Sequence, residues 1–294
     1  MIRLSKENST YTFSAEHPPA IRIPPGETIV FEVWDAIDDQ IHSDEDSASK
    51  IDLSHVNAAT GPVYVEGAKP GDMLVAEILD IQPWNWGAAL IIPGFGFLQD
   101  TIPGPYTKVF HLEPDGTMRF GPKIRLPLRP MIGTIGVAPS EPITTLSSGA
   151  HGGNLDTTDI RVGCKVYLPV FVEGALFGVG DVHATMGDGE VCGTGIECGA
   201  EVTIRLDLHP GLSIKRPRLE SSTEIMTIAS SEEGLEAAIR LALEDMIEWL
   251  QQEKGLSPEE AYVLVSIAGD VRIGQIVDPA VTVRVAVPKG VFVA

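Results

Sequence analysis

The first two thirds of this chain consist of short apolar segments interrupted by turn residues. Thirty glycines and 22 prolines among 294 residues supply these turns, for example at Lys69-Pro70-Gly71-Asp72 and His209-Pro210-Gly211. No long helical pattern alternates with these segments, so a doubly wound α/β sheet is not expected. The pattern predicts a mainly β architecture, a sandwich or a barrel. The predicted strands cover residues 28–33, 63–65, 73–81, 108–112, 132–137, 165–172 and 202–208.

The last third of the chain changes to a helical pattern. A capping box at residues 230–233 predicts the start of a helix that ends near Gly255, with apolar residues at helical spacing: Leu235, Ile239, Ala242, Met246, Trp249 and Leu250. Ser257 and Pro258 begin a second helix, and residues 281–287 form a final strand. We therefore expect a β-sandwich or β-barrel core over residues 1–214. A small α+β module over residues 215–294 packs on it, with the last strand able to return to the core.

The composition excludes several classes of function. The formal charge of −20 argues against nucleic acid as a partner, because phosphates require a basic surface. No segment approaches the roughly 20 apolar residues that span a bilayer, and the first residues lack the apolar core of a secretory signal. The three cysteines form no disulfide framework. We expect a cytoplasmic protein with neither a membrane nor a nucleic acid as partner.

Residues 180–190, Gly-Asp-Val-His-Ala-Thr-Met-Gly-Asp-Gly-Glu, contain the strongest candidate site. They follow the apolar run 166–179, which we interpret as a buried strand. Asp181 and His183 are two residues apart, so an extended chain directs both toward one face. Asp188-Gly189 is typical of a tight turn that folds Glu190 back toward that face. Such a group of carboxylates and imidazole suits a divalent metal or an acid–base pair.

Three other segments contribute polar side chains that such a site needs. Residues 151–156, His-Gly-Gly-Asn-Leu-Asp, combine donors and acceptors with glycines whose backbone can approach a ligand. Asp35 follows the apolar run 29–34, and Asn57 begins the turn at residues 57–62. Taken alone, the 151–156 segment fits an ordinary turn equally well, in which Asn and Asp bond their own backbone.

Other chemistries leave weaker signals. Cys192 lies two residues after Glu190 and offers a thiolate nucleophile, although no Lys lies nearby to complete a Glu-Lys-Cys amidase site. The chain lacks a phosphate loop, a Gly-x-Ser-x-Gly elbow and a Gly-x-Gly-x-x-Gly motif at a strand–helix junction. These absences exclude the common nucleotide enzymes and serine hydrolases.

Several motifs occur in order along the chain, at residues 57–65, 70–72, 93–96, 130–139, 151–156, 180–193 and 268–273. Taken together, these motifs resemble the acetamidase/formamidase family. The resemblance implies hydrolysis of short aliphatic amides such as formamide and acetamide to the carboxylate and ammonia. It also implies metal dependence in some members and a fold that combines β-sandwich, β-barrel and a small α/β portion. Ala58 and Met186 depart from the Pro and Gln expected there, which bears on substrate choice more than on reaction type.

We therefore predict a metal-dependent amidase that acts on a small neutral amide and assembles as a homodimer or higher homo-oligomer. A divalent cation, Zn²⁺ or Ca²⁺, would activate water. Glu190 or Asp181 would act as base and proton carrier beside His183. Asn154 and the amides of Gly152 and Gly153 would stabilise the oxyanion, with Asn57 facing the substrate. The predicted metal ligands come from Asp35, His151, Asp181, His183 and Glu190.

Three alternatives remain open from the sequence. The chain can be a non-catalytic β-rich binding protein that retains the pocket. It can hydrolyse another amide or a lactam with the same residues. Its catalysis can also use the Cys192 thiol in place of a metal.

Overall fold

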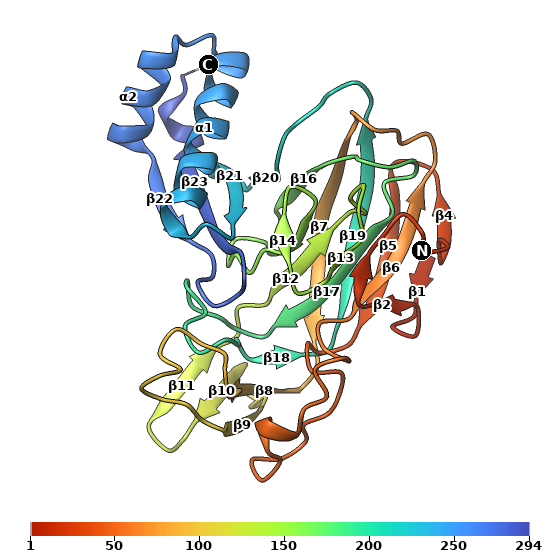
Figure 1. The fold of residues 1–294 in the computed structure, drawn as a ribbon, viewed down its shortest axis with the longest axis vertical. Coiled ribbons are helices and arrows are strands. Elements are labelled where there is room, and N and C mark those ends of the chain that lie inside the picture. Colours follow the sequence, from red (N-terminus) through yellow and green to blue (C-terminus); the bar gives the residue numbers. More distant parts are fainter. Residues whose placement is uncertain (1, 294) are drawn as a thin grey trace.

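The computed structural model describes residues 2–293 of the chain. It is mostly β, with two large sheets and two α-helices, which confirms the predicted fold class (Figure 1). The first sheet has nine strands. In spatial order they are β1 (Ile2–Leu4), β5 (Glu27–Val33), β19 (Ala200–His209), β7 (Met73–Pro83), β16 (Lys165–Pro169), β20 (Arg218–Glu220), β21 (Glu224–Ser231), β23 (Val281–Pro288) and β22 (Asp270–Ile273).

The second sheet has ten strands and includes the start of the candidate segment 180–190. Its main path runs through β14 (Ser148–Gly149), β15 (Gly152–Asn154), β12 (Met131–Gly136), β17 (Phe177–His183), β18 (Glu197–Cys198), β8 (Trp86–Ile91) and β9 (Tyr106–His111). A branch adds β6 (Ala59–Val65) beside β17, with β2 (Ser9–Thr10) and β4 (Ile21–Ile23) on β6. All seven residues of β17 are buried, so this strand lies at the centre of the sheet.

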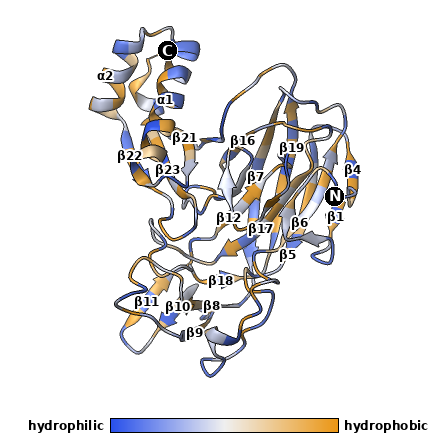
Figure 2. Ribbon diagram, in the orientation of Figure 1, coloured by the Kyte–Doolittle hydropathy of each residue, from blue (hydrophilic) through white to orange (hydrophobic). Residues whose placement is uncertain are grey.

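The main hydrophobic core lies between these two sheets. Phe31 of β5 and Phe177 of β17 are fully buried and meet edge to face, with ring centroids 5.8 Å apart. In Figure 2 the strands of both sheets mix hydrophobic with hydrophilic residues, and so do the two helices. Burial alternates along β19, as expected for a strand with one face on a core.

The C-terminal region adds the two helices at one end of the molecule, opposite β8 and β9 (Figure 1). α1 (Leu235–Lys254) and α2 (Pro258–Ala268) pack on β21 and β23 through a second core that includes Met246 and Val285. Neither helix is long and apolar enough to cross a membrane. β20 pairs with β16, so the nine-stranded sheet continues from the first part of the chain into this region. The division at residue 214 stays a prediction.

Three local predictions differ from the structure. The turn predicted at residues 57–62 is mostly strand, because β6 begins at Ala59. The capping box at residues 230–233 is wrong, because Ser230 and Ser231 end β21 by pairing with β23, and α1 begins after Gly234 without a side-chain cap. The single buried strand over residues 166–179 is also wrong. β16 ends at Pro169 and β17 begins at Phe177, with a loop between them. By contrast, Ser257 caps α2 in a complete capping box, as predicted.

Smaller elements complete the fold. β3 (Thr12–Phe13) pairs with β13 (Ile143–Thr144), and β10 (Thr117–Phe120) pairs with β11 (Ile124–Pro127). Short 3₁₀ helices cover Ala48–Lys50 and Lys289–Val291. A third, minor core joins the loop after β5 to β8 and β9, through residues such as Ile37 and Leu90. This minor core fixes the loops that surround the site described next.

Candidate active site

β17 delivers two polar side chains to its carboxyl end. Asp181 and His183 come from this buried strand, and His183 pairs across the sheet with Glu197 of β18. Asp181 has φ +55°, outside the extended region, so its backbone departs from regular strand geometry. Gly133 on the neighbouring β12 leaves room for this departure. A Cβ at Gly133 would lie 2.3 Å from an Asp181 oxygen.

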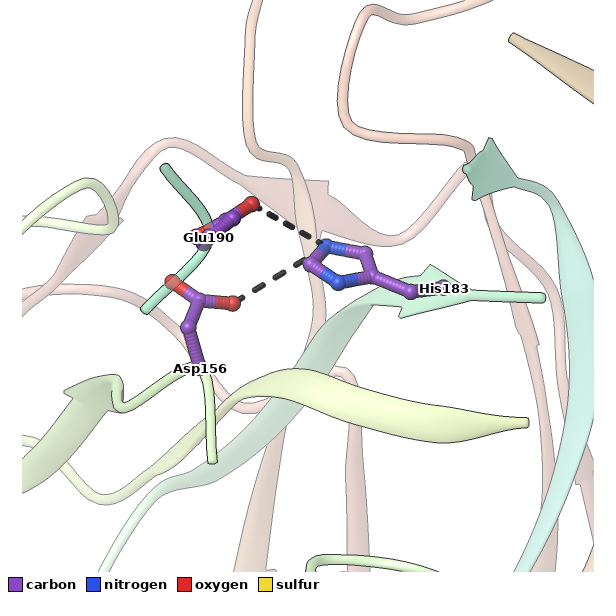
Figure 3. Close-up of side chains that lie close together, drawn as sticks. All are labelled: Asp156, His183 and Glu190. Atoms are coloured by element: carbon purple, nitrogen blue, oxygen red, sulfur yellow. Dashed lines mark ion pairs between the residues drawn. The ribbon is translucent and has the colours of Figure 1, made fainter. Parts of the chain in front are cut away.

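Four carboxylates surround one nitrogen of His183. Nε2 lies 3.0 Å from Asp181 Oδ1 and 3.0 Å from Glu197 Oε2. It lies 3.8 Å from Asp156 Oδ1 and 3.9 Å from Glu190 Oε1, the two residues that Figure 3 shows converging on the imidazole. Every one of these side chains is at most 6% exposed. Within residues 2–293, the ion pairs of these four carboxylates all go to His183.

The other ring nitrogen of His183 faces a sulfur atom. Met186 Sδ lies 3.1 Å from Nδ1. A thioether sulfur accepts hydrogen bonds weakly and donates none, so Nδ1 can only be the donor in this contact. Nε2 is hydrogen-bonded to Asp181 Oδ1, and a metal ion would bind Nε2 in place of the proton in that bond. The Met186 side chain therefore contacts the imidazole directly.

A cavity of about 210 Å³ opens beside this group. Its polar wall includes Asp181, Glu190, Glu197 and Asp278, the last from the loop between β22 and β23. The volume is far larger than a single-water void and suits a small molecule. Its apolar wall consists of Ala36, Ile37, Leu53, Val56, Ile92, Phe95 and Leu146. We call Asp156, Asp181, Glu190, Glu197 and Asp278 the carboxylate cluster.

Crowding of buried negative charge raises pKa values across most of the cluster. Burial raises the pKa of Glu197 to about 7, with the charge of Asp181 adding to it and that of His183 opposing it. Burial likewise raises the pKa of Asp278 to about 7 and those of Asp156 and Glu190 well above their usual range. The folded chain therefore needs protons or a cation in this place.

The pKa values of His183 and Asp181 shift in the directions that favour their charged forms. Burial alone would lower the pKa of His183, but the charges of Glu197 and Asp181 outweigh it and raise that pKa well above its usual value. Burial would raise the pKa of Asp181, but the charge of His183 and its hydrogen bond lower it below the usual value. Asp181 therefore keeps its negative charge beside the imidazole.

A hydrogen-bonded network links the cluster to the amide side chains. Asn154 Nδ2 donates to Asp278 Oδ2 at 2.7 Å, and Asn154 Oδ1 accepts from Asn57 Nδ2 at 2.8 Å. Thr134 of β12 donates to Asn154 Oδ1 as well. These contacts leave one Asn154 amide hydrogen without a protein acceptor, and both Asn154 and Asn57 line the cavity. Asn154 can therefore donate to a ligand there.

The donor set fits a metal ion. Among residues 2–293, both oxygens of Asp156 are buried without a hydrogen-bond donor, and Oε2 of Glu197 has only its ion pair with His183, which is unfavourable unless a cation or proton compensates. Ligand atoms about 2.1 Å from a tetrahedral zinc lie roughly 3.4 Å apart, and the distances from Nε2 range from 3.0 to 3.9 Å. Two groups qualify, and each includes His183: one with Asp156 and Glu190, the other with Asp181 and Glu197.

The structure brings some of the predicted site residues together and leaves others apart. Asp181, His183 and Glu190 converge, and Asn154 and Asn57 line the adjacent cavity. Gly152 and Gly153 are buried within β15, which pairs with β12 and β14, and neither lines the cavity. They are therefore not placed to donate to a ligand in that cavity.

Asp35 and His151 lie outside both groups that could hold a metal ion. Asp35 Oδ1 accepts the backbone N–H groups of Ile37 and Asp39 and so caps a turn. His151 packs edge to face on Phe13, and burial lowers its pKa to about 4, so it is neutral. Neither side chain therefore lies with the group around His183.

Sequence reasoning did not select three members of the cluster. Asp156 belongs to the polar segment 151–156 but was not predicted as a ligand, and Glu197 and Asp278 were not singled out at all. Glu197 stands alone between Ile196 and Cys198, and a lone carboxylate in an apolar segment is a signal of buried function. Asp278 has no such signal, because it reaches the site only through the folding of the loop after β22.

Cys192 is partly exposed, and within residues 2–293 both of its polar contacts are with Thr194. Its Sγ lies 3.5 Å from the Thr194 carbonyl oxygen, and no base contacts it in the described part of the chain. A thiol nucleophile needs such a base to form its thiolate. The geometry therefore favours the metal-based reading of the site over the thiol-based one.

Comparisons with known proteins agree with this geometry. Residues 5–147 and 141–294 match the profile of the Acetamidase/Formamidase family. The crystal structure of acetamidase from Bacillus halodurans has a TM-score of 0.96 to this chain at 44% identity, and covers 99% of this chain and 98% of that one. A predicted acetamidase/formamidase of Thermoanaerobacter tengcongensis gives a TM-score of 0.95 at 41% identity, over 99% and 96% of the two chains.

The curated relatives are more distant in sequence. The acetamidase of Mycolicibacterium smegmatis is 30% identical over 263 residues, which cover 66% of this chain and 64% of that protein. The chain matches 61–64% of the length of the curated relatives. The match to the family profile, in contrast, extends along almost the whole chain.

Proposed function

The chain belongs to the acetamidase/formamidase family, and we propose that it is a metal-dependent amidase that hydrolyses short aliphatic amides to the carboxylate and ammonia. The observation that carries this proposal is one buried imidazole nitrogen among four carboxylates beside a small cavity. A neutral amide suits a cavity whose polar wall is already rich in negative charge. The apolar wall, including Ile37, Val56 and Phe95, offers space for the acyl group.

We assign the ion to His183 Nε2, Asp181 and Glu197, with Asp156 as a further oxygen donor. Asp181 and Glu197 are the carboxylates nearest to Nε2, and the unpartnered oxygens of Asp156 lie close by. An imidazole ligand favours Zn²⁺ over Ca²⁺, which binds oxygen ligands. When bound, such an ion supplies a polarised carbonyl and a water of lowered pKa.

Glu190 is the candidate acid–base residue. It lines the cavity, yet its Oε1 lies farther from Nε2 than the oxygens of Asp181 and Glu197. Its raised pKa, caused mainly by burial, suits a carboxyl that takes up a proton from water. Glu190 would accept the proton of the attacking water and pass it to the leaving nitrogen. The free amide hydrogen of Asn154 would donate to the oxygen on which negative charge develops.

The test is ammonia release from formamide, acetamide and propionamide by the purified protein, together with its zinc content. We expect His183→Ala to lose at least a thousandfold in turnover and to lose bound zinc, with its circular dichroism unchanged. Cys192→Ser is the matched control and should keep turnover within a factor of two. No ammonia from any of these amides with zinc bound would favour the non-catalytic binding protein. Loss of turnover in Cys192→Ser alone would favour the thiol mechanism.

A further inference from the structure

Arg284 of β23 is a buried cation near the site that the proposed reaction does not use. Its side chain is 3% exposed. Nε pairs with Asp159, and Nη2 bonds both oxygens of Asp188 at 2.8 and 2.9 Å. Nη1 donates to the carbonyl of Ile273 at 2.6 Å. All three guanidinium nitrogens therefore have partners, and the two carboxylate partners come from different loops.

Each of these two loops carries a member of the carboxylate cluster. Asp159 follows Asp156 by three residues, and Asp188 precedes Glu190 by two. Thr158 Oγ1 also donates to Asp188 Oδ1 at 2.7 Å, so the two loops contact each other at the guanidinium. Asp156 and Glu190 are the residues that approach His183 from these loops (Figure 3). Arg284 thus links the two loops that carry Asp156 and Glu190.

The loop of Glu190 needs such support because its backbone is unfavourable. Glu190 has φ +45°, in the left-handed region that non-glycine residues rarely adopt. Its amide closes a tight turn on the carbonyl of Gly187 at 3.2 Å, with Asp188 and Gly189 at the centre. Gly189 is held to the C-terminal region by two backbone hydrogen bonds, to Gly274 and from Ile276. The Arg284–Asp188 ion pair adds a side-chain contact between the same loop and the C-terminal region.

We propose that Arg284 is a positioning residue, which fixes the Glu190 carboxylate relative to His183 by holding Asp188 and Asp159 together. This inference rests on the proposed function, in which Glu190 transfers the proton. It assigns the C-terminal α+β region a part in catalysis, because Arg284, the Gly274–Ile276 backbone and Asp278 all reach the site from there. Loss of Arg284 should release the turn and move the proton-transferring group without removing any group that contacts substrate or ion.

The fold offers a matched control for the experiment. Arg272 of β22 lies directly opposite Arg284 in the β22–β23 pair and also binds carboxylates, Glu224 at 2.7 and 2.9 Å and Asp270 at 2.8 Å. Neither Arg272 nor its partners line the cavity. Arg272→Met therefore removes an ion-paired arginine from the same two strands and leaves the site intact.

The experiment compares Arg284→Met, Arg284→Lys and Asp188→Asn with Arg272→Met. For each, kcat and KM for acetamide, zinc content and the melting temperature are measured, with the assay well below every melting temperature. We expect kcat to fall about tenfold or more in Arg284→Met and Asp188→Asn, as for other residues that orient a catalytic group. KM should stay within threefold and zinc content should stay at the wild-type stoichiometry. Lys cannot bridge two carboxylates as a planar guanidinium does, so Arg284→Lys should recover only part of kcat.

The outcomes separate this inference from the proposed function. If Arg284→Met is too unstable to assay, Asp188→Asn decides, because Asp188 is 43% exposed and Asn is well tolerated in turns. A kcat of Asp188→Asn equal to that of Arg272→Met, in an active wild type, overturns the inference and leaves the function standing. A wild type without zinc and without amidase activity overturns both.

Discussion

Replacement of Glu197 by Gln tests whether the cluster is a site of uncompensated charge. The substitution keeps the shape of the side chain and removes one negative charge. Glu197 Oε1 accepts a hydrogen bond from the Gly195 amide at 2.7 Å, which a Gln oxygen can still accept. We expect the metal-free Glu197→Gln protein to lose less stability than metal-free wild type as the pH rises.

The size of this effect follows from the position of Glu197. Burial, joined by the charge of Asp181 and opposed by that of His183, raises its pKa from 4.5 to about 7. In the unfolded chain the carboxyl titrates at its ordinary value. Between pH 4.5 and 7 the folded protein therefore binds more protons than the unfolded chain, so the free energy of unfolding falls as the pH rises. At about 1.4 kcal/mol per pKa unit, the loss reaches roughly 3 kcal/mol.

Urea unfolding of chelator-treated protein at pH 4.5 and pH 7.5 measures this loss directly. The fall in unfolding free energy between the two pH values should be larger in wild type than in Glu197→Gln by roughly 3 kcal/mol. The exposed Glu233→Gln serves as control and should follow wild type. Zinc at about 100 times its Kd should return roughly 3 kcal/mol to wild type at pH 7.5. Equal pH dependence in Glu197→Gln and wild type would refute the reasoning.

Three further substitutions test separate parts of the structure. Gly133→Ala places a methyl group 2.3 Å from oxygens of both Asp156 and Asp181. Zinc affinity, measured by chelator competition, should therefore fall about 10- to 100-fold. An unchanged affinity would mean that these carboxylates do not hold the ion. Ser257→Ala removes the N-cap of α2 and should cost about 1 kcal/mol in urea unfolding, with amide turnover unchanged. His151→Gln should keep the zinc content of wild type in elemental analysis, because His151 lies outside both metal-binding groups; a loss of zinc would return it to the ligand set.

Features of the fold that depend on local sequence could be predicted, and features that depend on distant pairing could not. The Ser257 cap lies within four residues of its partners, so its pattern is sufficient. Residues 230–233 show the same kind of pattern, but pairing of Ser230 and Ser231 with β23, some 50 residues later, extends β21 through them. Tertiary contacts thus decided between two local structures that the sequence favours about equally.

The residues of the site divide in the same way, into those that the local sequence indicates and those that only distant pairing brings in. Asp181, His183 and Glu190 lie within ten residues of one another, so their spacing alone indicates a common site. Glu197 enters by pairing with His183 across β17 and β18, and Asp278 comes from a loop about 90 residues further along. Nothing in the local sequence around Asp278 connects it to His183. Its place in the cavity follows only from how β22 and β23 add to the sheet.

Backbone conformation explains why regular strand periodicity is a poor guide to this site. Among residues 2–293, eight non-glycine residues have positive φ, and four of them surround the cavity and cluster: Asn57, Asp156, Asp181 and Glu190. Asn and Asp tolerate this region better than most residues, while Glu does so at a cost. Each departure turns a side chain off the two faces that a strand offers, which lets several carboxylates meet at one imidazole. The strain and the crowded charge coincide at Asp156, Asp181 and Glu190, so a bound cation would offset the charge while packing and the Arg284 contacts hold the backbone.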